Sequence, residues 1–159
     1  AQGKINISGN GMAMPATVIC GVEDGPTVLI TAGIHSAEYV GIQAAMELAK
    51  EFQPEELKGN VIIVPLVNVS GFEHRTMVYK DGKNLNRVFP GDPEGTAADR
   101  IAYTIVTKLF SIADYYIDLH SGDGFEQLHP YVYYVGVVDE KTAEKSLHMA
   151  RHIGHRWRL

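Results

Sequence analysis

The sequence predicts a three-layer α/β/α domain built on a mixed, largely parallel sheet. Short β-branched, apolar runs alternate along the chain with segments whose apolar residues recur every three or four positions, which is the pattern of strands alternating with helices. The run at residues 61–67 (VIIVPLV) is apolar almost throughout, as expected of a strand that is covered on both faces. Pro65 within it indicates an edge position or an irregular end. In sheets of this class, functional sites lie beyond the carboxyl ends of the strands.

Two strands and a helix are expected before that run. Residues 17–22 (TVICGV) and 27–32 (TVLITA) are predicted strands, and the Glu-Asp-Gly-Pro turn between them leads us to expect that they are neighbours in the sheet. A helix is predicted over residues 37–52, because apolar residues recur there at helical spacing and Pro54 stops the pattern.

The second half continues the alternation after a long irregular segment. Residues 68–95 show no period and are rich in Gly, Asn, Asp and Lys, and a loop of this length in a compact domain is usually functional or disordered. A helix over 96–112, strands over 113–119 and 131–138, and a helix over 142–153 are predicted to follow. Three places therefore stand at carboxyl ends of strands: the turn before the first helix, the long loop, and the turn after the strand 113–119.

Length and composition exclude several classes of function. The 159 residues carry a net charge of −5, from 14 Lys and Arg against 19 Asp and Glu, and phosphate backbones need a basic surface, so we expect no nucleic-acid partner. Because no apolar run approaches about 18 residues, we expect no membrane partner and a cytoplasmic location. The single cysteine, Cys20, excludes paired-thiolate zinc sites and is interpreted as a small buried apolar residue. We expect one domain over residues 1–159.

The first of the three places reads Gly-Ile-His-Ser-Ala-Glu. His35 and Glu38 are three residues apart at a helix start, so both side chains lie on one face. An imidazole and a carboxylate placed in this way can take two corners of a zinc site whose fourth position is left for water. The alternative is structural, with Glu38 favoured by the helix dipole and His35 satisfied by hydrogen bonds.

The third place holds His120, which stands where the strand 113–119 ends and is a candidate third metal ligand. Asp118 lies two residues earlier on the same side of the strand, so it can orient an imidazole as an outer hydrogen-bond partner. The alternative is a histidine and an aspartate at a solvated rim of the sheet.

The long loop contains DGKNLNRVFPG, residues 81–91. Apolar residues between the polar ones indicate a loop that packs down on the domain, so that Asn86 and Arg87 are held in place. The guanidinium group matches a carboxylate with two hydrogen bonds, which makes Arg87 a candidate for binding an acidic group. The alternative is an ion pair with a structural aspartate.

Together the three motifs resemble the succinylglutamate desuccinylase/aspartoacylase family of the zinc carboxypeptidase superfamily. The resemblance rests on TAGIHSAEYVG (31–41), DGKNLNRVFPG (81–91) and DLHSG (118–122), in this order and at fitting separations, and it covers nearly the whole chain. It implies a zinc carboxypeptidase-like fold and hydrolysis of the amide bond of an N-acyl amino acid or a similar small substrate, with one Zn²⁺ ion as cofactor.

The resemblance also implies roles for residues of this chain. His35, Glu38 and His120 match the family's three zinc ligands, and Asn86 and Arg87 match the pair that binds the substrate carboxylate. In the implied mechanism a zinc-bound water attacks the carbonyl carbon while Arg87 holds a carboxylate of the substrate.

Two positions depart from the family pattern. Asn84 stands where the family usually has an aspartate that supports the first zinc histidine, and its amide oxygen can still accept a hydrogen bond from the imidazole. The family arginine that polarises the scissile carbonyl would fall near Met77. Arg75 is the nearest substitute and is therefore the candidate for this catalytic role.

The general base of the family is a glutamate on a later strand, well beyond the third zinc ligand. Family members are considerably longer than this chain, so we interpret residues 1–159 as the N-terminal portion of the catalytic domain. We expect this portion to bind one Zn²⁺ ion but to hydrolyse N-acyl amino acids poorly on its own. Glu126 matches no family motif and is interpreted as a solvated loop residue.

Two other functions fit the same residues. A zinc carboxypeptidase that acts on short peptides would use the same ligands, and a non-catalytic zinc-binding module would need no general base. An incomplete sheet would expose unpaired edges, which makes a second copy of the chain a candidate partner. His148 and His152 are four residues apart on a predicted helix and are interpreted as a surface pair.

Overall fold

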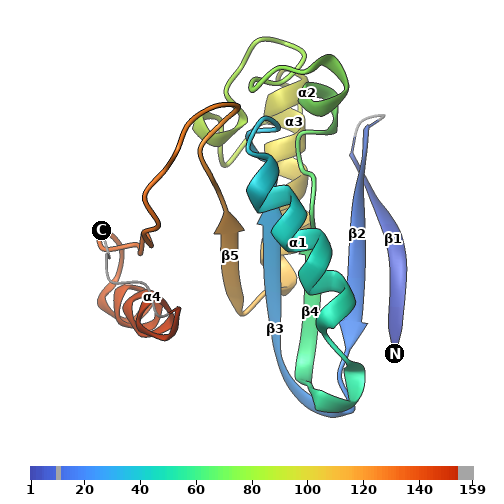
Figure 1. Ribbon diagram of the computed structural model, residues 1–159, viewed down its shortest axis with the longest axis vertical. Coiled ribbons are helices and arrows are strands. Elements are labelled where there is room, and N and C mark those ends of the chain that lie inside the picture. Colours follow the sequence, from blue (N-terminus) through green and yellow to red (C-terminus); the bar gives the residue numbers. More distant parts are fainter. Residues whose placement is uncertain (10–11, 154–159) are drawn as a thin grey trace. The chain divides into compact units, whose positions relative to one another are not determined.

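A five-stranded mixed sheet forms the centre of residues 1–126 (Figure 1). The computed structural model describes residues 1–9 and 12–153. The strands, in the spatial order β1-β2-β4-β3-β5, are β1 (Gln2–Gly9), β2 (Met12–Cys20), β4 (Lys58–Val64), β3 (Glu23–Ala32) and β5 (Tyr115–Leu119). Strands β4, β3 and β5 run parallel, whereas β2 is antiparallel to β4 and β1 is antiparallel to β2. The predicted mixed sheet is confirmed.

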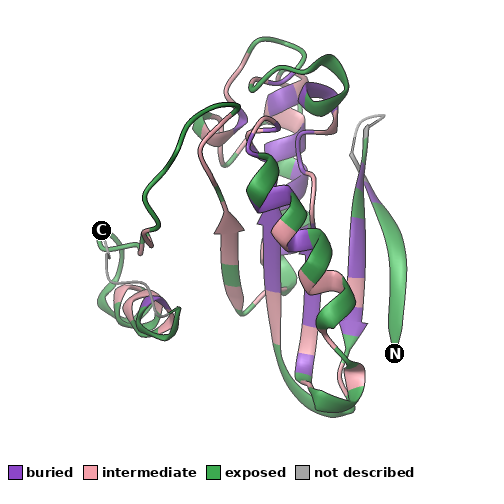
Figure 2. Ribbon diagram, viewed as in Figure 1, coloured by how far each residue is buried: buried purple, intermediate pink, exposed green. Residues whose placement is uncertain are grey.

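Helices cover both faces of this sheet. The helical segments of residues 1–126 are α1 (Tyr39–Glu51), a 3₁₀ turn (Pro54–Glu56), α2 (Val69–His74), a 3₁₀ turn (Leu85–Arg87), and α3 (Ala97–Thr104), which continues through a π-helical turn (Ile105–Leu109) into a 3₁₀ turn (Phe110–Ile112). Alternate residues of β4 point to opposite faces. Ile63 packs in a cluster with Ala45 of α1, whereas Ile62 packs in a cluster with Ile101 of α3. Figure 2 shows the buried strands between the two helical layers, so the predicted α/β/α arrangement is confirmed.

The predicted adjacency of the strands 17–22 and 27–32 is wrong, because β4 lies between them. The strand with the most continuous apolar sequence takes the central position, where both of its edges are paired. The first residues of β3 pass close to the start of β4, and Gly59 permits this approach. A Cβ on Gly59 would lie 2.0 Å from the carbonyl oxygen of Pro26, and its φ is +82°. Pro65 follows the last residue of β4, so the irregular end is confirmed and the edge position is wrong.

Three further expectations differ from the structure. In the described part of the chain, residues 131–138 form no strand and contain only an isolated bridge at position 132, because a β-branched and aromatic composition favours a strand without by itself setting its pairing. Cys20 is exposed rather than buried, since it is the last residue of β2. The predicted loop 68–95 contains α2 and a 3₁₀ turn, which are too short to produce a periodic pattern.

Residues 127–153 belong to a second compact unit. Its helix α4 (Glu140–His152) agrees with the predicted helix over 142–153, and Asp139 caps it by accepting a hydrogen bond from the backbone N–H of Thr142 at 3.0 Å. Within the described residues, no helix has the length and apolar character needed to cross a membrane. The single domain over residues 1–159 stays a prediction.

Candidate metal centre

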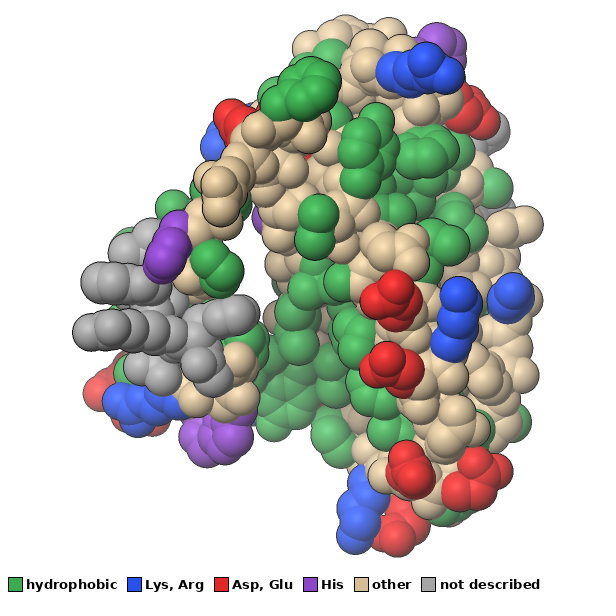
Figure 3. Space-filling view, in the orientation of Figure 1, with side chains coloured by type: hydrophobic (Ala, Val, Ile, Leu, Met, Phe, Trp, Pro, Cys, Tyr) green, Lys and Arg blue, Asp and Glu red, His purple; other side chains and the backbone are tan. Residues whose placement is uncertain are grey.

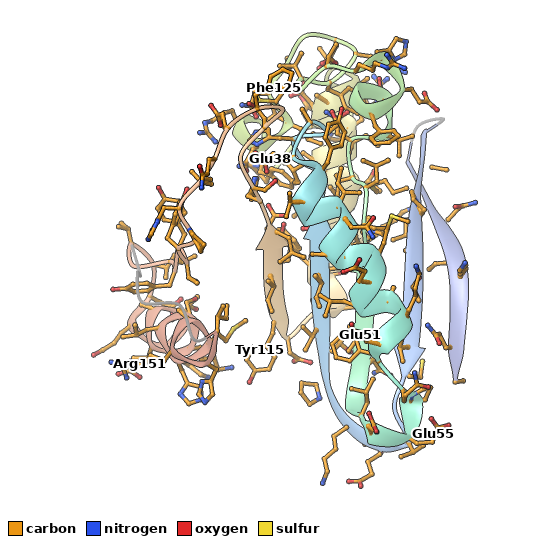
Figure 4. The ribbon with its side chains drawn as sticks, viewed as in Figure 1. Glu38, Glu51, Glu55, Tyr115, Phe125 and Arg151 are labelled. Carbon is orange, nitrogen blue, oxygen red and sulfur yellow. The ribbon has the colours of Figure 1, made fainter. Side chains whose placement is uncertain are left out.

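Three candidate ligands meet at the carboxyl ends of two neighbouring parallel strands. His35 follows β3, Glu38 immediately precedes α1, and His120 follows β5. One ligand atom from each of the three lies within 4.8 Å of the other two. Figure 4 shows Glu38 at the amino end of α1, above the carboxyl ends of the strands. The β3–β5 pairing, in which Ala32 is opposite Leu119, thus brings together Glu38 and His120, which are 82 positions apart in the sequence.

The close packing of α1 against β5 depends on a glycine. A Cβ on Gly41 would lie 2.9 Å from the carbonyl oxygen of Leu119, which is closer than side-chain carbons approach a backbone oxygen. Because Gly41 has no side chain, the first turn of α1 can lie next to the end of β5. This contact brings Glu38 within reach of His120, the residue that follows Leu119.

The carboxylate of Glu38 lies between the two imidazole rings. Its Oε1 is 2.8 Å from Nδ1 of His35, and its Oε2 is 2.8 Å from Nδ1 of His120. The backbone N–H of Ser121 also donates to Oε2, at 3.1 Å. The two rings are edge-on to each other, with centroids 5.2 Å apart. The Nδ1 atoms of both histidines therefore point to one place.

The opposite nitrogen of each ring donates to an oxygen. Nε2 of His35 lies 3.0 Å from Oδ1 of Asn84, and the same oxygen accepts the backbone N–H of Asn86 at 3.0 Å. Since that N–H can only donate, the atom facing His35 is an acceptor and Nε2 carries the hydrogen. Nε2 of His120 likewise lies 2.8 Å from Oδ2 of Asp118. These partners fix both rings with Nδ1 directed at Glu38.

The three groups strongly perturb one another's ionisation. Burial would raise the pKa of Glu38, but hydrogen bonds from His120, His35 and Ser121 outweigh burial and lower the pKa from 4.5 to about 2. Hydrogen bonds to Asp118 and then to Glu38 raise the pKa of His120 from 6.5 to about 10. The hydrogen bond to Glu38 also raises the pKa of His35, against the opposing effect of burial.

This donor set fits a zinc ion. Without metal, hydrogens on the Nδ1 atoms fill the space between the imidazoles and the carboxylate. When these protons leave, the two Nδ1 lone pairs and the carboxylate oxygens converge on one place that a cation can occupy, and two histidines with one glutamate are a known ligand set of catalytic zinc. Each histidine also has the outer hydrogen-bond acceptor that zinc-bound histidines usually have. The single cysteine, Cys20, is not part of this donor set, because it is opposite Asn60 at the start of β4, at the end of the sheet away from the three ligands.

The candidate substrate-binding residues lie in the turn beside this centre. Leu85 has no exposed surface and anchors the turn, as its apolar character led us to expect. Asn86 lines a cavity of about 520 Å³ whose other walls are mostly apolar and aromatic: Ile34, Phe89, Pro90, Val106, Phe110, Tyr116 and Asp118. Arg87 is exposed, and its Nη1 donates to the carbonyl oxygen of Asn86 at 3.1 Å.

The remaining candidates are not held at the centre by any contact of the described residues. Arg75 is exposed at the C-terminus of α2, where its φ of 55° places it in the left-handed region. Glu126 is exposed and accepts the backbone N–H of Asp123 at 3.4 Å, as a loop residue does. On the face that carries α1, the described side chains form no continuous basic surface (Figure 3).

Sequence reasoning missed two residues that support Asp118. Thr31 donates to Oδ1 of Asp118 at 2.6 Å, and the hydroxyl of Tyr116 lies 2.9 Å from Oγ1 of Thr31. The spacing of Tyr116 and Asp118 could have indicated that these two side chains lie together, since residues two apart on a strand share a face. The strand pairing that makes Thr31 the neighbour of Asp118 has no local signal in the sequence.

Comparisons with known proteins agree with this fold. The family model for the succinylglutamate desuccinylase/aspartoacylase catalytic domain matches residues 24–158. The chain is 37% identical over 142 residues to N-alpha-acetyl-L-2,4-diaminobutyric acid deacetylase from Halomonas elongata, which is 89% of this chain and 41% of that protein.

Two solved structures of related proteins are also similar to this chain in sequence and in fold. An aspartoacylase family protein from Mesorhizobium loti is 30% identical with a TM-score of 0.80, over 95% of this chain and 49% of that one. The product-bound ectoine utilization protein from Ruegeria pomeroyi is 40% identical with a TM-score of 0.65, over 70% of this chain and 34% of that one. The chain thus spans less than half the length of these relatives. It belongs to the succinylglutamate desuccinylase/aspartoacylase family.

Proposed function

We propose that this chain provides the zinc-binding and substrate-carboxylate-binding part of a hydrolase that cleaves the amide bond of N-acyl amino acids. The observation that carries the proposal is the convergence of His35, Glu38 and His120, with both Nδ1 atoms directed inward and both Nε2 atoms held by oxygen acceptors. The name of the Halomonas relative, a deacetylase of an N-acetylated amino acid, supports this class of substrate.

Each residue has a defined task in this proposal. His35, Glu38 and His120 hold one zinc ion, which when bound polarises the scissile carbonyl and activates water for attack. Asn84 and Asp118 keep the two rings in the ligating orientation through the hydrogens on Nε2. Arg87 binds the α-carboxylate of the substrate with two hydrogen bonds, next to the Asn86 side chain. Arg75 is the candidate group that stabilises negative charge on the carbonyl oxygen.

Neither Glu38 nor Asp118 provides the acceptor for the proton of the attacking water, because both carboxylates are already engaged by hydrogen bonds. Both oxygens of Glu38 face histidines, and the two oxygens of Asp118 accept from Thr31 and His120. We therefore propose that residues 1–159 bind zinc and substrate but turn substrate over slowly by themselves.

Metal stoichiometry tests the centre. The protein is stripped with a chelator, reloaded with Zn²⁺, dialysed, and analysed for metal. We expect about one equivalent of zinc, as in single-ion His₂Glu sites, and its loss in His35→Ala. His148→Ala is the matched control, because it removes an exposed histidine of α4 and should leave the zinc content unchanged. Well-folded protein that retains no zinc would contradict the proposal.

Ligand binding tests the substrate class. Calorimetric titration of the zinc-loaded protein with N-acetyl amino acids and with dipeptides of the same C-terminal residue compares the deacylase with the zinc carboxypeptidase. We expect the N-acetyl amino acids to bind at least as tightly as the dipeptides, and free amino acid to be released slowly. Preferential binding and rapid cleavage of dipeptides would favour the carboxypeptidase. Binding of zinc but of neither ligand would favour a non-catalytic zinc-binding module.

A further inference from the structure

A short chain of hydroxyl groups lies beneath the candidate metal centre. Thr31 is opposite Asp118 in the parallel pairing of β3 with β5, and Tyr116 lies two residues before Asp118 on the same face. Thr31 has no exposed surface. Its Oγ1 lies 2.6 Å from Oδ1 of Asp118 and 2.9 Å from the hydroxyl oxygen of Tyr116. Neither hydroxyl belongs to the proposed metal ligands.

The hydrogen bonds of this chain have one direction. A threonine hydroxyl has a single hydrogen, and Thr31 donates it to the carboxylate of Asp118. Thr31 can then only accept from Tyr116, so the tyrosine hydroxyl is the donor of the second hydrogen bond. The order of donation is therefore from Tyr116 to Thr31 and from Thr31 to Asp118, whose other oxygen accepts from His120.

We propose that Thr31 and Tyr116 are positioning residues for the metal centre, which hold the Asp118 carboxylate so that His120 presents Nδ1 to the ion. The proposal rests on the zinc site of the proposed function. The terminal torsion of an aspartate side chain has a broad energy profile, so a carboxylate held at one oxygen only can rotate. With Oδ1 fixed by Thr31, Oδ2 stays where the Nε2–H of His120 meets it.

The other histidine has an equivalent support built from the backbone. Oδ1 of Asn84, the partner of His35, is fixed by the backbone N–H of Asn86, which belongs to a turn anchored by the buried Leu85. On the His120 side the neighbouring strand offers a side chain in place of a backbone donor. Thr31 thus does for Asp118 what the Asn86 amide does for Asn84, and Tyr116 in turn fixes the hydroxyl of Thr31.

The affinity for zinc tests this inference. Thr31→Val keeps the side-chain shape and removes the hydroxyl, Thr31→Ser keeps the hydroxyl, and Tyr116→Phe removes only the end of the chain. Zinc dissociation constants are measured by competition with a chromogenic chelator. Because loss of an outer partner typically weakens metal binding by about 10–100-fold, we expect about tenfold weaker binding for Thr31→Val, a smaller effect for Tyr116→Phe, and recovery in Thr31→Ser. Thr104→Val is the matched control, since Thr104 is a buried threonine that donates to the Arg100 carbonyl within α3.

A spectroscopic measurement separates positioning from a loss of stability. The visible spectrum of bound Co²⁺ reports ligand geometry, and we expect it to change in Thr31→Val and Tyr116→Phe but not in Thr31→Ser or Thr104→Val. Wild-type affinity and an unchanged Co²⁺ spectrum in Thr31→Val would overturn the inference and leave the zinc site intact. If Thr31→Val does not fold, Tyr116→Phe decides in the same way. Absence of zinc binding in the wild-type protein would overturn the proposed function and this inference together.

Discussion

The candidate metal ligands and the candidate arginines belong to neighbouring loops, yet the fold holds them in opposite ways. Glu38 accepts hydrogen bonds from two imidazoles and a backbone amide, and each histidine has a partner on both ring nitrogens. Arg87 is exposed and donates to a carbonyl of its own turn, and Arg75 is exposed at a helix end. Among the described residues, no carboxylate oxygen lies within ion-pair distance of either guanidinium.

This difference separates two kinds of binding cost. The metal centre is ordered when the protein folds, so metal binding has a small free-energy cost for ordering the ligands, but the ion must displace protons. An exposed arginine loses side-chain freedom only when a ligand holds it, and that loss reduces the affinity for the ligand. Metal binding should therefore respond to pH and to the outer hydrogen-bond partners, whereas replacing either arginine should leave metal binding unchanged.

The largest expected effect is the pH dependence of zinc binding. The pKa of His120 is raised to about 10, so in the metal-free protein its imidazole carries a proton that zinc must displace. The apparent affinity for zinc should rise by up to about tenfold per pH unit for each proton released, until the pH reaches about 10. Chelator competition at pH 6, 7 and 8 measures this rise, and a pH-independent affinity would contradict it.

The same shift predicts the stability of the metal-free protein. A group whose pKa is higher in the folded than in the unfolded protein stabilises the fold fully below the unfolded value, here 6.5, and loses this contribution as the pH rises through about 10. Glu38, with a pKa of about 2, stabilises above 4.5 and loses its contribution as the pH falls toward 2. The unfolding temperature without metal should therefore decline on both sides of pH 4.5–6.5.

The second effect concerns the arginine that we propose binds the substrate carboxylate. Hydrogen bonds to charged groups contribute about 1.5–3 kcal/mol, so Arg87→Ala should weaken binding of an N-acetyl amino acid by roughly tenfold to a hundredfold at unchanged zinc content. The matched control is Arg100→Ala, because Arg100 of α3 also donates to a backbone carbonyl, that of Gly95. The loss should vanish for the carboxamide analogue of the ligand, and an equal loss for acid and amide would contradict the assignment.

A smaller change is expected at the outer partner of His35. Asn84→Asp keeps the acceptor oxygen and adds a negative charge, which makes the imidazole a better ligand, so zinc should bind a few-fold more tightly. Asn84→Ala removes the acceptor and should weaken zinc binding by about tenfold. The dissociation constants of both variants measure this, and weaker binding in Asn84→Asp than in the wild type would show that the carboxamide is required.

The smallest effect is on stability at the end of α2. Arg75 has a φ of 55°, a conformation that costs a residue with a Cβ about 1 kcal/mol relative to glycine. Arg75→Gly should therefore be about 1 kcal/mol more stable than Arg75→Ala in urea unfolding, while both variants lose the same charge. Equal stability of the two variants would show that the left-handed conformation is not retained.

The sequence predicted the layers of the fold and the positions of the site because both have local signals. Helical spacing identified α1 and α3, and the uniformly apolar run identified the central strand β4. The HxxE pair and His120 follow the ends of β3 and β5, and the Asn-Arg turn belongs to the long segment after β4, so all three lie in loops that parallel strands present together.

The parts that could not be predicted depend on partners distant in the sequence. The order of β2, β4 and β3 is decided by which edges pair, and residues 131–138 have the composition of a strand but form none in the described part of the chain. The support of Asp118 by Thr31 requires the register of β3 against β5, which no single segment reveals. The exposure of Cys20 also depends on its place in the fold, at the end of β2, and not on its residue type.

The most direct test of the zinc centre is a crystal structure of the zinc-loaded protein with anomalous data collected on both sides of the zinc absorption edge. We predict one strong anomalous peak at about 2.0–2.2 Å from Nδ1 of His35, a carboxylate oxygen of Glu38 and Nδ1 of His120. A peak at the His148 and His152 pair instead, or ligation through Nε2 of either His35 or His120, would contradict the account.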